Sequence, residues 1–99
     1  MREIEVDIPA NARLDQVEAV IEAACAAEGL RLTLKGTLKA YPGCVHWHYK
    51  YGTEAGVLEI TLWAAKRHIW FKVSAGRQGA WTEGAMERLK EVIEWECTA

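Results

Sequence analysis

The sequence lacks the features that mark disulfide-rich, membrane-spanning or exported chains. Among its 99 residues there are only three cysteines, Cys25, Cys44 and Cys97, and no Cys-x-x-Cys pair. An odd number of widely spaced cysteines favours free thiols in a reducing compartment over a disulfide framework. Apolar runs are only a few residues long, so no membrane span is expected. Charged residues follow Met1, so we expect no signal peptide and a cytoplasmic location.

No charge sign dominates the whole chain, whose net charge is −2. The balance hides an asymmetry, because residues 1–30 sum to −5, residues 31–77 to +6 and residues 78–99 to −3. If residues 31–77, the basic middle segment, form one surface, that surface could bind an anionic partner. The alternative is that lysines and arginines simply protect strand edges.

The apolar periodicity predicts a single α+β domain over residues 1–99. No repeat, linker or low-complexity segment is evident. A period of two indicates strands and a period of 3.6 indicates helices. The predicted strands cover 2–8, 30–41 (with a bend or bulge at Gly36), 44–51, 57–63 and 68–73, and the predicted helices cover 11–28 (capped by Asn11) and 83–97 (capped by Thr82). The order β-α-β-β-β-β-α predicts a mainly antiparallel five-stranded sheet with two helices on one face, which leaves the other face open.

Turn signals and cross-strand pairs predict two hairpin registers. If Pro42-Gly43 is a two-residue loop, Lys39 lies opposite His46. A turn over residues 64–67 places Glu59 opposite Lys72 and also pairs Trp63 with His68.

The stretch from Cys44 to Tyr51 carries the most unusual pattern. Alternate residues would face the core, while Cys44, His46, His48 and Lys50 would share the outward face. Tryptophans on the neighbouring strands extend this face, and exposed aromatic patches usually mark partner interfaces. Our leading hypothesis is therefore a small non-catalytic binding or assembly domain, expected to be a homodimer, unless a tail, the loop over residues 74–81 or a helix covers the tryptophans. The residues predicted to form this binding face are Lys39, Tyr41, His46, His48, Lys50, Trp63, His68, Trp70 and Lys72.

Two alternatives use the same face. Its mixture of cations and aromatics could bind single-stranded nucleic acid or another anionic ligand, although the overall acidity weighs against phosphate binding. Alternatively, Cys44, His46 and His48 could bind a metal ion, with Glu59 or His68 as a further ligand if the strand order allows it.

Evidence for catalysis is weaker. Cys44 and His46 would point in parallel rather than toward each other, and no orienting Asp or Asn accompanies them. Arg77, in a Gly-rich segment before the last helix, is a weak anion-binding candidate. The sequence predicts no cofactor and favours a non-enzymatic role.

Overall fold

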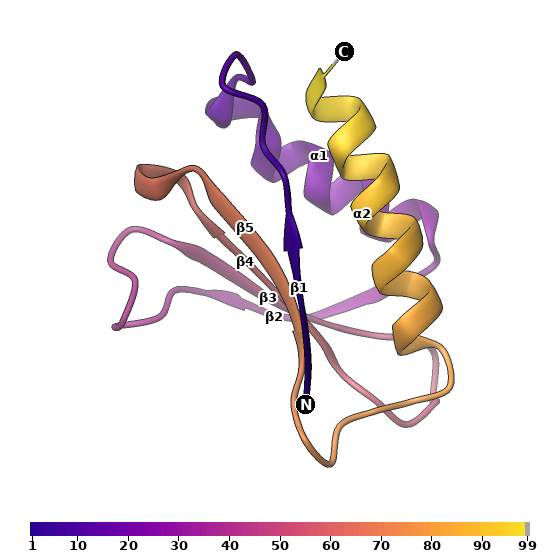
Figure 1. Cartoon of the computed structure of the whole chain (residues 1–99). Helices are drawn as coiled ribbons and strands as arrows, with labels where there is room; N and C mark the ends of the chain where they lie inside the picture. Colours follow the sequence, from indigo (N-terminus) through magenta and orange to yellow (C-terminus); the bar gives the residue numbers. More distant parts are fainter. Residues whose placement is uncertain (99) are drawn as a thin grey trace.

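The computed structural model describes residues 1–98, which form a five-stranded antiparallel sheet with two helices packed on one face (Figure 1). This arrangement confirms the predicted two-layer α+β fold and its β-α-β-β-β-β-α order. Within the described residues, no helix is long and apolar enough to cross a membrane. The elements are β1 (Arg2–Val6), α1 (Leu14–Ala27), β2 (Arg31–Gly36), β3 (Val45–Lys50), β4 (Leu58–Trp63), the short 3-10 helix η1 (Ala64–Lys66), β5 (His68–Val73) and α2 (Thr82–Thr98).

The strand order in the sheet is β1-β5-β4-β3-β2. The pairing of β4 with β5 confirms the predicted hairpin, since Glu59 lies opposite Lys72 and Trp63 lies opposite His68. The N-terminal strand β1 pairs with β5 rather than with its sequence neighbours. The four C-terminal strands therefore form a meander, and the sheet edges are β1 and β2.

The core lies between the sheet and the two helices. Strands β3, β4 and β5 contribute alternate side chains to it, as the period of two predicts. Fully buried residues include the large aromatics Trp47 and Phe71, and α2 adds Leu89 and Ile93. The indole N–H of Trp47 donates to Glu22 Oε2 at 2.9 Å, which satisfies the only polar atom of this buried side chain.

The first helix begins later and ends nearly where the sequence predicts. Residues 9–12 form a turn, in which the Ala12 N–H donates to the Pro9 carbonyl at 3.0 Å, so Asn11 does not cap the helix. At the other end Gly29 takes a φ of +76°, and its N–H donates to the Ala26 carbonyl. This left-handed residue ends the helix as expected for glycine at that position.

The register between β2 and β3 differs from the prediction. Gly36, rather than Lys39, lies opposite His46, and β2 ends at Gly36. Pro42-Gly43 does form a turn, in which the Cys44 N–H donates to the Tyr41 carbonyl at 3.0 Å. That turn only closes a longer loop over residues 37–44, so the predicted two-residue hairpin is wrong.

A β-bulge between Leu32 and Leu34 reverses the predicted faces of the later part of β2. Lys35 lies opposite the inward-facing Trp47, so its side chain is on the helix side of the sheet. Its ammonium pairs there with Glu18 and Glu22 of α1, at 2.8 and 2.6 Å. One lysine of the basic middle segment therefore does not belong to the outward face.

Candidate functional site

The loop over residues 37–44 folds back across the outward face of the sheet. Tyr41 contacts Trp63 and Trp70 edge-on, with ring centroids 5.0 Å apart in both pairs. The Trp63 indole N–H also donates to the Pro42 carbonyl at 3.1 Å. Trp70 is only 8% exposed. The tryptophans predicted on this face do lie there, but the loop over residues 37–44 covers them. The sequence left open that these residues are covered, but by a tail, by the 74–81 loop or by a helix rather than by this loop.

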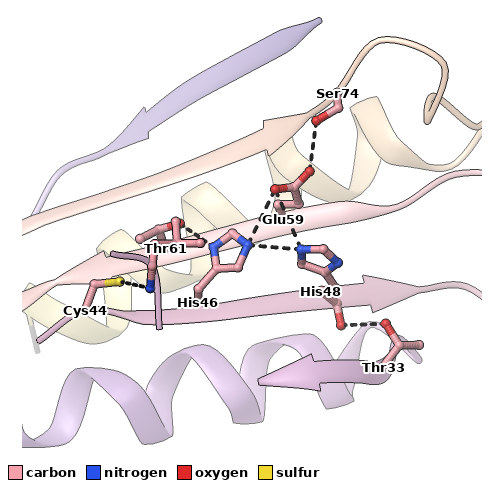
Figure 2. A network of polar contacts seen from close by, with 8 residues as sticks. Thr33, Cys44, His46, His48, Glu59, Thr61 and Ser74 are labelled. Atoms are coloured by element: carbon pink, nitrogen blue, oxygen red, sulfur yellow. Dashed lines mark hydrogen bonds and ion pairs between the residues drawn. The ribbon is translucent and has the colours of Figure 1, made fainter. Parts of the chain in front are cut away.

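Beside this loop, His46, His48 and Glu59 form a polar cluster between β3 and β4 (Figure 2). His46 Nε2 lies 3.0 Å from His48 Nε2. Glu59 Oε1 lies 3.5 Å from the first nitrogen and 3.7 Å from the second. The strand pairing explains this meeting, because His48 lies directly opposite Glu59 in the register of β3 and β4.

Two hydroxyl groups contact the polar atoms of His46 and Glu59 that do not face the other cluster members. His46 Nδ1 lies 2.8 Å from Thr61 Oγ1, and Thr61 is buried. The Ser74 hydroxyl donates to Glu59 Oε2 at 2.9 Å. If Nδ1 of His46 carries its proton toward Thr61, the Nε2 lone pair faces the other two members. Such outer contacts fix the tautomer and the orientation of metal ligands.

Burial favours the neutral form of His46. Its side chain is 8% exposed. Desolvation is the main reason why the pKa of His46 lies below its usual value, and the charges of His48 and Lys72 lower the pKa further, against the opposing effect of Glu59. A neutral imidazole offers a lone pair, which is the form that binds metal ions.

The three facing atoms have the separations of metal ligands. Zinc bonds to nitrogen and oxygen of about 2.0–2.2 Å place neighbouring tetrahedral ligands roughly 3.3–3.5 Å apart. The observed separations are 3.0, 3.5 and 3.7 Å, and the nearest point equidistant from all three atoms, which lies in their plane, is about 2.0 Å from each. A donor set of two histidines and one carboxylate also leaves coordination positions open, as in catalytic rather than structural sites.

Cys44 and His68, which the sequence grouped with these histidines, lie apart from the cluster. The Cys44 thiol is buried and accepts from the backbone N–H of Leu38 at 3.3 Å. His68 contacts Glu5 on β1, and its ring lies tilted against that of Trp70 with the ring centroids 4.5 Å apart. The strand order thus removes His68 as a fourth ligand and supplies Glu59 instead.

Of the remaining predicted site residues, Lys72 lies beside the cluster, whereas Lys39, Lys50 and Arg77 lie away from it. Lys39 is exposed in the covering loop, Lys50 lies at the end of β3 opposite Arg31, and Lys72 lies opposite Glu59. Arg77 is exposed in the loop before α2, where its carbonyl accepts from the Val57 N–H.

Basic residues of the middle segment also serve structural contacts elsewhere. The Arg67 guanidinium donates to the carbonyls of Pro9 and Ala12, at 2.6 and 3.3 Å. With Lys35 on the helix side, the basic middle segment is divided between several parts of the molecule.

The sequence named two of the three cluster residues outright and Glu59 only as a conditional ligand. Thr61 and Ser74 were not connected with the site. Little in the sequence connected them with the site, because hydroxyl residues are common on strands and at strand ends. Comparisons of the chain with protein-family models, with curated proteins and with solved structures found no match.

Proposed function

We propose that this protein binds one divalent transition-metal ion, with zinc the first to test, through His46, His48 and Glu59. The observation that carries the proposal is the spacing of the three donor atoms, which share a common point at bonding distance. Exposed acidic groups often lie together without binding a metal, but these three side chains are only 8, 22 and 14% exposed. Without a metal, His46 Nε2 and His48 Nε2 are at hydrogen-bond distance from each other, and a metal ion would replace that contact with bonds to all three side chains.

The contacts behind the ligands also support metal binding. Thr61 and Ser74 occupy the remaining polar atoms of His46 and Glu59. The inner atoms are therefore the ones left to bind a metal. Because imidazoles must be neutral to bind, the lowered pKa of His46 favours metal uptake at neutral pH.

The experiment is a zinc titration of chelator-treated protein by calorimetry, with native mass spectrometry to count the bound ions. We expect one zinc per chain, and we expect His46→Gln, His48→Gln and Glu59→Gln each to weaken binding at least tenfold. His68→Gln is the matched control, since His68 lies outside the cluster beside Glu5. Uptake that survives His46→Gln, or that disappears in His68→Gln, would refute the proposal.

We propose assembly as a second candidate function, at the edge strand β2. Every residue of β2 is exposed, and Leu32 and Leu34 are 45 and 46% exposed. An exposed edge with apolar side chains can pair with a second copy, although the bulge in β2 makes such pairing harder. Sedimentation should show a dimer that Leu34→Lys dissociates and Val92→Lys, on α2, leaves intact. A monomer at all concentrations would exclude this role.

A further inference from the structure

A small cavity shares a wall with the candidate metal site. It has a volume of about 110 Å3. This is room for a few water molecules or one small organic ligand. Two of the three proposed metal ligands, His46 and Glu59, line it. The other lining residues are Glu3, Leu38, Tyr41, Thr61, Trp70 and Lys72.

We infer that the metal ion keeps an open coordination position toward this cavity, and that a small carboxylate occupies it with its charge shared between the metal and Lys72. The inference rests on the proposed function, because it requires the metal. Among the described residues, the cluster provides three protein ligands. Zinc takes four ligands, so an external ligand must complete its coordination.

The hydroxyl of Thr61, on β4, and the thiol of Cys44, just before β3, are already engaged. Thr61 Oγ1 is bonded to His46, and the Cys44 thiol accepts from the Leu38 backbone. Both groups are held in these contacts, and Cys44 is not among the facing donor atoms. The open position is therefore left to a water molecule or a ligand that enters from the cavity.

The charges of the cavity wall select an anion once the metal is bound. With Glu3 and Glu59 ionised and Lys72 protonated, the formal charge of the lining is −1. A divalent ion changes that sum to +1, so a monoanion is repelled before metal binding and attracted afterwards. Lys72 lies opposite both Glu3 and Glu59 in the sheet, between the two carboxylates.

The rest of the lining suits the organic part of a carboxylate. Leu38 and Trp70 give the cavity an apolar side, which can contact a short alkyl group. The volume limits that group to a few carbon atoms. A phosphate monoester would bring two negative charges into a wall that has a net charge of only +1.

The test uses cobalt(II) in place of zinc, because its visible absorption reports the ligands around the metal. Cobalt-loaded protein is titrated with acetate, and we expect a saturable change in the absorption bands. Acetamide, which has the same shape without the charge, should produce no change at equal concentration. Lys72→Met should weaken acetate binding about tenfold and leave cobalt affinity unchanged or higher. Lys50→Met removes a lysine of the same sheet face outside the cavity, and it should bind acetate like the unmodified protein.

The outcomes separate this inference from the proposed function. If cobalt and zinc do not bind at all, the proposed function fails and the inference fails with it. If cobalt binds but acetate changes nothing, the open position is refuted while metal binding stands. If Lys72→Met and Lys50→Met bind acetate equally well, the assignment of Lys72 is refuted.

Discussion

The substitution Gly79→Ala should destabilise the fold through one close backbone contact. Gly79 lies in the loop that precedes α2 and packs against the loop between β3 and β4. A Cβ atom at Gly79 would lie 1.9 Å from the carbonyl oxygen of Ala55 and 2.9 Å from Trp81 Nε1. Because the nearest atom belongs to the backbone, rotation of a side chain cannot relieve the clash. The two loops have to separate.

The hydrogen bonds that join the two loops set the magnitude, because separation breaks them. The Trp81 indole N–H donates to the Ala55 carbonyl at 2.9 Å, and the Val57 N–H donates to the Arg77 carbonyl at 2.9 Å. Two such bonds, at about 0.5–1.5 kcal/mol each, together with weaker packing of Trp81 give an expected decrease of about 2–3 kcal/mol in the free energy of unfolding. For a chain of this length each kcal/mol lowers the melting temperature by roughly 4–8 °C, so we expect a decrease of at least about 8 °C.

Gly84→Ala is the matched control. Gly84 lies inside α2, where the added Cβ would meet only the guanidinium of Arg88, with Nη1 at 2.9 Å. That group is the end of a flexible side chain whose partly exposed ion pair with Glu28, at 2.9 Å, contributes little, so it can move away. Alanine is also favoured over glycine in a helix. We expect Gly84→Ala to be neutral or stabilising.

The assay is urea unfolding of both variants, followed by tryptophan fluorescence and circular dichroism. Coincident transitions from the two probes would justify a two-state free energy. A Gly79→Ala protein within about 0.5 kcal/mol of the unmodified chain would refute the close contact between the loops. Equal destabilisation in both glycine variants would do the same.

Three further predictions test the cover over the sheet, the buried thiols and the histidine cluster. Tyr41→Ala should expose Trp70 and shift the native fluorescence maximum to longer wavelength, whereas an unchanged spectrum would show that the loop does not cover it. In the native protein iodoacetamide should modify Cys97 well before Cys25, because Cys25 is fully buried and burial raises its pKa to about 12; equal rates for the two thiols would contradict this burial. The pKa of His46 is lowered in the folded state, mainly by burial, so the unfolded state, with an ordinary pKa of about 6.5, takes up the proton first. The unfolding free energy of metal-free protein should therefore fall as the pH decreases from about 7 toward the folded pKa, and His46→Gln should reduce that fall, whereas equal pH dependence in both proteins would refute this reasoning.

Local sequence pattern was enough to predict the elements and one hairpin. The alternation around Trp47 and Ile60 defines their inward face at any strand order, because the period of a strand is a property of its backbone. The β4–β5 register also follows from the sequence, because a short turn brings Glu59 opposite Lys72 and Trp63 opposite His68. Similarly, Gly29 ends the first helix because few other residues adopt its positive φ.

The sequence pattern could not predict the length of the loop between β2 and β3 or the bulge in β2. Pro42-Gly43 is a good turn signal wherever it occurs, and nothing local distinguishes a hairpin loop from the last turn of a longer one. The bulge adds one residue to a strand, which moves every later side chain to the opposite face, including Lys35. Both features depend on which residues of β3 pair with β2.

The sequence by itself determined that His46 and His48 share one face of one strand. Only the tertiary structure decided that Glu59 joins them, that His68 does not, and that Tyr41 covers the tryptophans beside them. The physical reason is that side chains two residues apart on a strand are neighbours by backbone geometry alone, whereas a third ligand comes from another strand. Its position follows from the order and register of the sheet, which the packing of the whole core selects.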